Sequence, residues 1–136
     1  MGNIMAKSAT KANNGAVTIM VVDDEEPAAD IIGQMLKALG YKTEIQLNPV
    51  KALEIFKLRP DSFDLVMTDM IMPHMTGAQL SKKLKAIRPN IPIILCTGYS
   101  SLIDENRARL IGIAAYLTKP VALSEISKTV KMILDE

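Results

Sequence analysis

Five short apolar runs alternate with segments of helical period along this chain, and this alternation constrains its fold more than any other feature. The runs are rich in β-branched residues and lie at Val17–Val22, Lys42–Leu47, Asp64–Thr68, Ile91–Cys96 and Ala114–Thr118. Strands that alternate with helices predict a parallel sheet covered by helices on both faces. The runs near 17–22 and 64–68 are mainly apolar and do not alternate with polar residues, so we expect them to form central strands.

The intervening segments carry apolar residues at spacings of three and four, which predicts helices with one apolar stripe each. The stripes are Ala28, Ile31, Ile32, Met35, Leu36 and Leu39, then Val50, Leu53 and Phe56, then Leu80, Leu84 and Ile87, then Ile103, Leu110 and Ile111, then Leu123, Ile126, Val130, Ile133 and Leu134. Pro27 suits the first turn of the first helix, and Gly40 suits its end. We therefore expect an α/β fold with a single doubly wound, five-stranded parallel sheet, in which right-handed crossovers join the strands.

The chain has 136 residues, of which 49% are hydrophobic, and this size suits one domain. Residues 1–16 are polar and small, so we interpret them as a disordered leader or a cloning remnant that precedes a domain at 17–136. The single cysteine, Cys96, excludes an intramolecular disulfide and a site with several cysteine ligands. Because Cys96 lies in an apolar run, we expect it to be a small core residue.

The net charge of +1 gives no large field that would favour nucleic acid. Four basic residues cluster at Lys82, Lys83, Lys85 and Arg88, but they interleave with apolar positions, and we interpret them as a solvated helix face. No apolar stretch approaches the length of a membrane span, and the N-terminus has no signal peptide. We expect a cytoplasmic protein without direct nucleic-acid binding or membrane insertion.

Polar residues stand where four of the apolar runs end. Asp23 and Asp24 follow the first run, Asp69 the third, Thr97 the fourth and Lys119 the fifth. Open α/β sheets build their sites at the carboxyl ends of parallel strands, so these side chains are expected to converge. Each residue also has a plain explanation as a cap or turn, and only their conjunction favours a metal-assisted phosphoryl acceptor.

Three converging carboxylates cannot all stay ionised unless something compensates their charge. Lys119 supplies one positive charge, and a divalent cation would supply the rest. Oxygen ligands alone favour Mg²⁺, with Mn²⁺ as a substitute, and no cluster of His or Cys exists to bind zinc. Asp69 is then the natural nucleophile, Lys119 and the metal would stabilise the incoming phosphoryl group, and Thr97 would donate a hydrogen bond to it.

At these positions the sequence resembles the receiver domain of two-component response regulators. The resemblance rests on Val21-Val22-Asp23-Asp24-Glu25, on Thr68-Asp69-Met70-Ile71-Met72-Pro73-His74-Met75-Thr76-Gly77, on Leu95-Cys96-Thr97-Gly98 and on Tyr116-Leu117-Thr118-Lys119-Pro120, and it covers roughly 17–136. It implies a flavodoxin-like strand order 2-1-3-4-5, as in the chemotaxis regulator of this family. It also implies that Asp69 accepts a phosphoryl group from the phosphohistidine of a sensor histidine kinase or a phosphotransfer protein.

The resemblance further implies a role for each site residue. Asp24, Asp69 and the backbone carbonyl of Ile71 would ligate Mg²⁺, and Asp23 would act mainly through a metal-bound water. Lys119 would pair with the phosphoryl group and precede a cis peptide bond to Pro120. Thr97 and Tyr116 would turn inward on phosphorylation and remodel the face made by the fourth helix, the fifth strand and the fifth helix.

Some positions depart from the usual family pattern. Thr76 stands where the family often has Asp, and it still suits the N-cap of the third helix. Gly98 replaces the commoner Ala and should leave the phosphate more accessible. Ile71 and Tyr99 occupy positions that tune phosphate lifetime in the family. Because Ile71 cannot orient an attacking water and Tyr99 would shield the site, we expect slow self-dephosphorylation.

Two other functions compete with this interpretation. A phosphatase of the haloacid dehalogenase type also uses a nucleophilic Asp, but it needs an acid where this chain has Ile71. A receiver-like assembly module that is never phosphorylated would typically lack an acid, the acceptor or the Lys, and all are present. The chain should therefore be no enzyme beyond catalysing its own phosphorylation and dephosphorylation.

The sequence leaves the output open. It fits a stand-alone receiver, or a receiver taken from a hybrid kinase or a larger regulator. The downstream protein target is unknown. A homodimer through the face of the fourth helix, fifth strand and fifth helix is an alternative, with Leu102, Ile103 and Tyr116 as candidate contacts.

Overall fold

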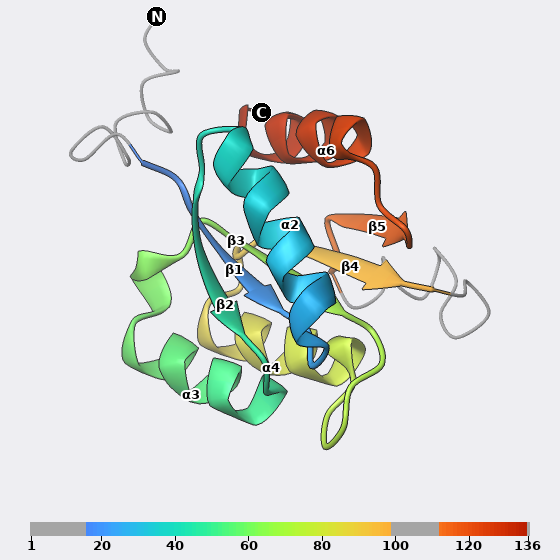
Figure 1. Ribbon diagram of the computed structural model, residues 1–136. Coiled ribbons are helices and arrows are strands. Elements are labelled where there is room, and N and C mark those ends of the chain that lie inside the picture. The colour runs from blue at the N-terminus through green and yellow to red at the C-terminus, as the bar shows by residue number, and fades with distance from the viewer. Residues whose placement is uncertain (1–15, 99–111, 136) are drawn as a thin grey trace, which may run out of the picture.

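The computed structural model describes residues 16–98 and 112–135. A five-stranded parallel sheet forms its centre, with strand order β2-β1-β3-β4-β5 (Figure 1). The strands are β1 (Thr18–Val22), β2 (Lys42–Gln46), β3 (Leu65–Asp69), β4 (Ile93–Thr97) and β5 (Ala115–Thr118). This is the predicted fold class and strand order, and every predicted strand is present within two residues of its expected start.

Helices cover both faces of the sheet. The described helices are α2 (Glu26–Ala38), α3 (Pro49–Leu58), α4 (Gly77–Ile87) and α6 (Leu123–Asp135), with a short 3₁₀ helix, η1 (Pro60–Ser62). Side chains of α3 and α4 pack with Met20, Val66 and Leu95 on one face. Those of α2 and α6 pack with Val21, Met67 and Ile94 on the other. The fourth predicted helix and Tyr99, with the candidate dimer contacts Leu102 and Ile103, lie outside the described residues.

Local signals set the helix boundaries as the sequence predicts. Pro27 lies in the first turn of α2, and Gly40 follows its end with a φ of 97°, a conformation that glycine adopts without strain. Thr76 caps α4: its hydroxyl accepts a hydrogen bond from the backbone N–H of Gln79, whose side chain accepts one from the backbone N–H of Thr76. The departure at Thr76 from the usual family residue therefore leaves the cap intact.

Three predicted stripe residues are exposed rather than buried. Ile31 is 55% exposed, Val50 40% and Leu123 44%. Each begins or flanks an apolar stripe, but a single sheet face accepts only the part of the helix that points at it. In α2 this part is Ala29, Ile32 and Leu36, and the stripe is accordingly narrower than its pattern of apolar residues indicates.

The interpretation of the basic cluster as a solvated helix face is wrong for two of its four members. Lys82 and Lys83 are exposed, but Lys85 and Arg88 are half-buried. The Lys85 ammonium donates hydrogen bonds to the carbonyl oxygens of Pro89 and Ile91, at 3.1 and 2.8 Å. Arg88 donates to the carbonyl oxygens of Pro60 and Phe63 and so ties α4 to the loop that follows α3.

Among the described residues, no helix is both long and apolar enough to cross a membrane. Cys96 is 2% exposed and lies in β4, as expected for a core residue. Burial raises the pKa of its thiol to about 12, so at neutral pH Cys96 is a protonated, apolar-packed side chain.

Candidate functional site

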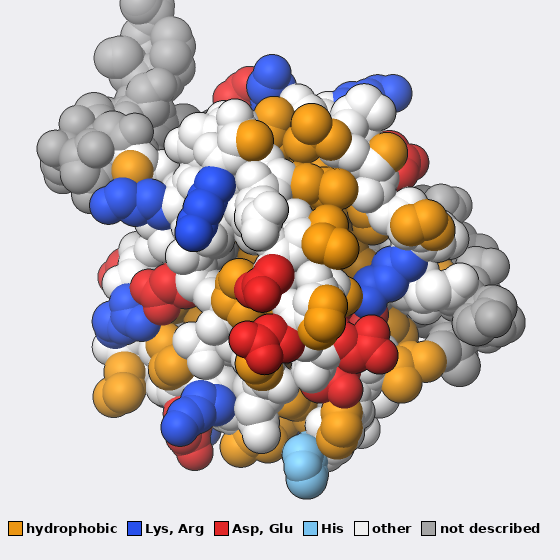
Figure 2. Space-filling model, viewed as in Figure 1, with side chains coloured by type: hydrophobic (Ala, Val, Ile, Leu, Met, Phe, Trp, Pro, Cys, Tyr) orange, Lys and Arg blue, Asp and Glu red, His pale blue; other side chains and the backbone are white. Residues whose placement is uncertain are grey.

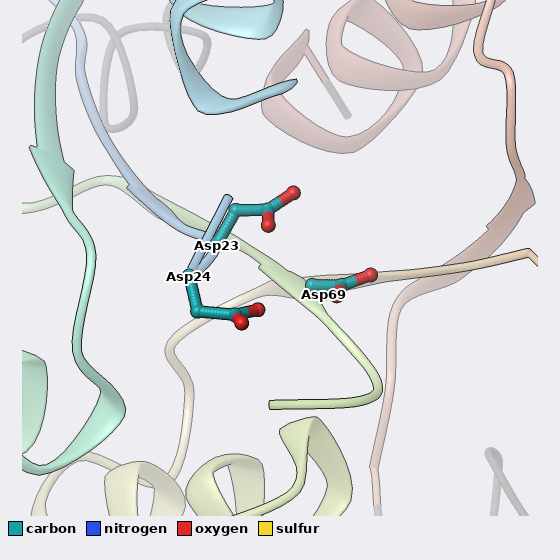
Figure 3. A group of neighbouring side chains, drawn as sticks. All are labelled: Asp23, Asp24 and Asp69. Carbon is teal, nitrogen blue, oxygen red and sulfur yellow. The ribbon is translucent and has the colours of Figure 1, made fainter. Parts of the chain in front are cut away.

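The carboxyl ends of β1 and β3 bring three aspartates together. Asp23 and Asp24 follow β1 directly, and Asp69 is the last residue of β3. Each offers a carboxylate oxygen, and these oxygens lie within 4.8 Å of one another (Figure 3). In Figure 3 all three carboxylates extend to the same side of the strand ends. The predicted convergence is thus present, because parallel neighbours β1 and β3 end at the same edge of the sheet.

Lys119 joins two of these carboxylates from the far edge of the sheet. It follows β5, and its backbone N–H donates a hydrogen bond to the carbonyl oxygen of Thr97 at 2.7 Å. Its Nζ lies 2.9 Å from Oδ1 of Asp69 and 3.1 Å from Oδ2 of Asp23. The peptide bond between Lys119 and Pro120 is cis, as the family resemblance implies. One ammonium therefore bridges acids that come from two different strands.

Burial makes this arrangement electrostatically demanding. Asp23 is 3% exposed, and its Oδ1 also accepts a hydrogen bond from the backbone N–H of Glu25. Burial and the nearby Asp23 raise the pKa of Asp69 above its ordinary value, although Lys119 opposes the shift. Burial alone would lower the pKa of Lys119, but its hydrogen bonds to Asp69 and Asp23 outweigh burial and hold that pKa above its ordinary value. Lys119 is therefore charged at neutral pH.

The three aspartates form a donor set that fits a hard divalent cation. All the donor atoms are carboxylate oxygens, and Asp24 is exposed, which leaves one side of the group open to solvent. With Lys119 included, the group still carries an excess of negative charge. Figure 2 shows acidic side chains gathered on this part of the surface, around the start of α2. Mg²⁺ suits these ligands, since it takes few carboxylates and keeps several waters.

The predicted switch residues lie on the two strands that follow β3 in the sheet, β4 and β5. Thr97 ends β4 and is 1% exposed, and Tyr116 lies in β5 opposite Leu95, half-buried against the core on the α3 and α4 side. Ile71 lies two residues beyond Asp69 and is 57% exposed. Of the predicted site residues, Tyr99 lies outside the described part of the chain.

The sequence interpretation missed one residue that shapes the site. Gly77 begins α4, and its N–H donates a hydrogen bond to the carbonyl oxygen of Met70 at 2.8 Å. A Cβ at this position would clash with the carbonyl oxygen of Asp69 and lie 3.0 Å from Cα of Met70. Only glycine lets α4 begin against the backbone of Asp69 and Met70. The available signal was a glycine directly after the N-cap Thr76.

Comparisons with known proteins give the family of this chain. A family model described as the response regulator receiver domain matches residues 19–131. Sporulation initiation phosphotransferase F of Bacillus subtilis is 33% identical over 117 residues, which are 85% of this chain and 92% of that protein. Transcriptional regulatory protein ZraR of Klebsiella oxytoca is 35% identical over 113 residues, 83% of this chain. The chain spans only 25% of the length of that ZraR protein.

Solved structures repeat the fold. A CheY-like receiver domain protein from Methanospirillum hungatei superposes with a TM-score of 0.80 at 32% identity and covers 88% of this chain and 94% of its own. The receiver domain of the Pseudomonas aeruginosa sensor histidine kinase PA1611 superposes with a TM-score of 0.79 and covers 89% of this chain and 99% of its own. At 21% identity it supports the fold alone, and its own active-site cleft holds a coordinated magnesium ion.

Proposed function

The chain belongs to the response regulator receiver domain family, and we propose that it is a phosphoacceptor signalling switch whose acceptor is Asp69. The observation that carries the proposal is the position of the Lys119 ammonium, 2.9 Å from Asp69 and 3.1 Å from Asp23. A half-buried cation held by two carboxylates at the ends of separate strands is suited to receive a third anionic group. A phosphoryl group on Asp69 is such a group.

The reaction is a transfer from a phosphohistidine of a sensor histidine kinase or a phosphotransfer protein. A carboxylate oxygen of Asp69 forms a bond to phosphorus, the bond between phosphorus and the imidazole nitrogen breaks, and the imidazole leaves with the electron pair. Lys119 then pairs with the phosphoryl oxygens. Because Lys119 stays charged beside its carboxylate partners, it is ready for this role without a proton transfer.

Asp23, Asp24 and Asp69, together with the backbone carbonyl of Ile71, would hold Mg²⁺, or Mn²⁺ in its place. When bound, the cation neutralises charge that develops on the transferred group. Asp23 has the smaller share of direct ligation in this proposal, because its two carboxylate oxygens already accept hydrogen bonds from Lys119 and from the N–H of Glu25. Asp24 is exposed and keeps its carboxylate available.

The signal would leave the site through Thr97 and Tyr116. Thr97 ends β4 beside Asp69, and β4 pairs with β5, which carries Tyr116. A hydrogen bond from the Thr97 hydroxyl to the phosphoryl group draws this strand end inward, and Tyr116 follows. The changed face includes β5 and α6 and would meet a downstream protein target. A homodimer through that face is a second use of it.

The experiment that tests the proposal is intact mass after incubation with acetyl phosphate, with and without Mg²⁺, beside the Asp69→Asn variant. We expect one added phosphoryl group that requires both Mg²⁺ and Asp69. If the wild-type chain gains none, a titration with beryllofluoride decides whether the site binds a phosphoryl mimic at all. Failure of both experiments would favour the alternative, a receiver-like assembly module.

The residue at position 71 bears on how long a phosphoryl group would stay on Asp69. An attacking water has to be oriented close to the phosphoryl group, and the exposed aliphatic side chain of Ile71 offers it no hydrogen bond. We therefore expect slow self-dephosphorylation of the isolated, phosphorylated domain. Following the loss of the added mass after acetyl phosphate is removed measures the lifetime, and a decay within seconds would contradict this expectation.

A further inference from the structure

Strand β2 forms one edge of the sheet, and no other described segment pairs with its outward backbone groups. In the parallel ladder with β1, the N–H of Lys42 donates to the carbonyl oxygen of Val17, and the carbonyl oxygen of Gln46 accepts from the N–H of Asp23. Alternate residues of a strand face the same neighbour, so Thr43 and Ile45 direct their N–H and C=O groups away from β1. Within residues 16–98 and 112–135 these groups form no hydrogen bond.

The side chains along this edge carry charges of opposite sign on either side of Thr43, a self-complementary pattern. Lys42 and Glu44 flank Thr43 and point to the same face of the sheet, because they are two residues apart. Lys42 is exposed, and Glu44 forms a paired hydrogen bond with the Arg59 guanidinium at 2.8 and 3.0 Å. A lone lysine on an edge strand opposes pairing with another strand. Here a glutamate two residues away offers such a lysine a partner on a second strand.

The surface beside this edge is hollowed. A cavity of about 650 Å³ is lined by Thr18, Lys37, Tyr41, Lys42, Glu44 and Arg59, among other residues. In Figure 2, basic and acidic side chains intermingle along the β2 side of the molecule, in contrast to the acidic cluster around the start of α2. The strand edge therefore has room for the side chains of an added strand. Many of the residues that line the cavity are charged.

We propose that β2 pairs in antiparallel fashion with β2 of a second copy of this chain, about a twofold axis at Thr43. In this register the two Thr43 residues exchange N–H to C=O hydrogen bonds, and the N–H of Ile45 donates to the carbonyl of Tyr41 in the second copy. Lys42 then lies opposite Glu44 of the second copy, and Glu44 opposite its Lys42. The same surface patch serves both copies, as a twofold interface requires.

The charge pattern selects this register and favours a second copy over another strand. An axis at Glu44 would place that residue opposite itself and bring like charges together, which is unfavourable. An axis at Ile45 would pair Glu44 with Gln46 and leave Lys42 without an acidic partner. A different peptide would need its own acid and base at matching positions, whereas β2 supplies both. The β2 edge also lies at the opposite side of the sheet from β5, so β5 and Lys119 stay accessible in the dimer.

The test is sedimentation velocity of the full chain over a concentration series, with two charge-reversal variants. Lys42→Glu and Glu44→Lys each place like charges opposite each other in their own homodimer, and we expect self-association about tenfold or more weaker than that of the wild type. In a mixture of the two variants, a strand with two acidic side chains at these positions pairs with a strand that has two basic ones, and we expect association to return. Recovery in the mixture distinguishes a pairing defect from a folding defect.

Two further variants complete the test. Thr43→Pro removes an outward N–H without breaking the ladder to β1 and should also abolish association. Lys83→Glu makes the same charge change at an exposed position of α4 and should leave association at the wild-type level. A wild-type chain that stays monomeric throughout, or one whose association is insensitive to Lys42→Glu and Thr43→Pro, overturns the proposal. Association that is insensitive to these two variants would show that the copies meet through a surface other than β2.

Discussion

Lys119 and Lys85 are both half-buried, yet they lie at opposite ends of the sheet, and their pKa values are shifted in opposite directions. At the carboxyl ends of the strands, Lys119 contacts two carboxylates, and their attraction raises its pKa in spite of burial. At the amino ends, Lys85 caps the neutral carbonyl oxygens of Pro89 and Ile91, and burial lowers its pKa. The partners, rather than the degree of burial, decide which way the pKa of each lysine moves.

This difference is consistent with the role proposed for Lys119 and with a structural role for Lys85. In the proposed reaction, the carboxylates that hold Lys119 would compete with the phosphoryl group for the same ammonium, so the contacts of Lys119 would be exchanged. Carbonyl groups that end α4 and precede β4 have no such competitor, and Lys85 fastens the two elements. A Cβ on Gly112, three residues before β5, would lie 3.0 Å from Cε of Lys85, so the backbone at Gly112 packs closely against the Lys85 side chain.

Replacement of each lysine by methionine should give the largest effects and should show whether the two lysines have different roles. Lys119→Met removes the only described cation that contacts Asp69, and we expect its phosphorylation by acetyl phosphate to slow by about 10²–10³-fold. Lys85→Met leaves two carbonyl oxygens unpaired and should lower the free energy of unfolding by about 1–3 kcal/mol without slowing phosphorylation. Rates of adduct formation and urea unfolding measure the two effects. Equal slowing in both variants would contradict the assignment of separate roles.

The gain in stability on binding Mg²⁺ should also distinguish the carboxylate site from the site of Lys85. A cation that binds only the folded chain adds about 2.7 kcal/mol at a concentration 100 times its dissociation constant. We expect wild type and Lys85→Met to gain equally from Mg²⁺, because Lys85 lies away from the carboxylates. Asp24→Asn should gain less at the same Mg²⁺ concentration, since it loses an exposed charged ligand. Thermal unfolding with Mg²⁺ and with a chelator gives the gains, and an undiminished gain in Asp24→Asn would remove that residue from the ligand set.

The sequence predicted the carboxyl end of the sheet better than the amino end, for a physical reason. Asp23, Asp69 and Lys119 each follow an apolar run, and parallel strands bring their carboxyl ends together regardless of loop conformation. Lys85 and Arg88 contact backbone carbonyls of loops, and a carbonyl has no sequence signature. Their pattern of charge resembles that of solvated residues until the loop positions are known.

Close packing between elements could not be predicted from the sequence either. The apolar stripes of α2 and α3 are real, but the share of each stripe that the sheet covers depends on helix orientation, so Ile31 and Val50 are exposed. The role of Gly77 depends on the approach of α4 to Asp69. Residue types at strand ends could be interpreted from the sequence, whereas distances between backbones could not.

Glycine substitutions test that distinction between backbone and side-chain contacts. Gly77→Ala would place its Cβ against the backbone of Asp69 and Met70, which cannot yield cheaply, and we expect a loss of about 1–3 kcal/mol in unfolding free energy with slower phosphorylation. Gly33→Ala is the matched control in α2, because the one close contact of its Cβ would be with the flexible end of the Ile45 side chain, at 2.9 Å. Its loss should be smaller and its phosphorylation rate unchanged. Equal losses would show that the contact with the acceptor backbone is not special.

The smallest effect is expected at Gly98, directly after Thr97, the residue proposed as the switch. A Cβ there would meet nothing within 4 Å, and the backbone lies outside the left-handed region. Gly98→Ala should therefore raise the free energy of unfolding by about 0.4–1 kcal/mol, because alanine restricts the unfolded chain. Urea unfolding measures this change, and a loss of stability would reveal a contact formed by the loop. If the variant also prolongs the lifetime of the phosphoryl group, the glycine exposes the phosphate to water, and the site end of the sheet is tuned by access as well as by charge.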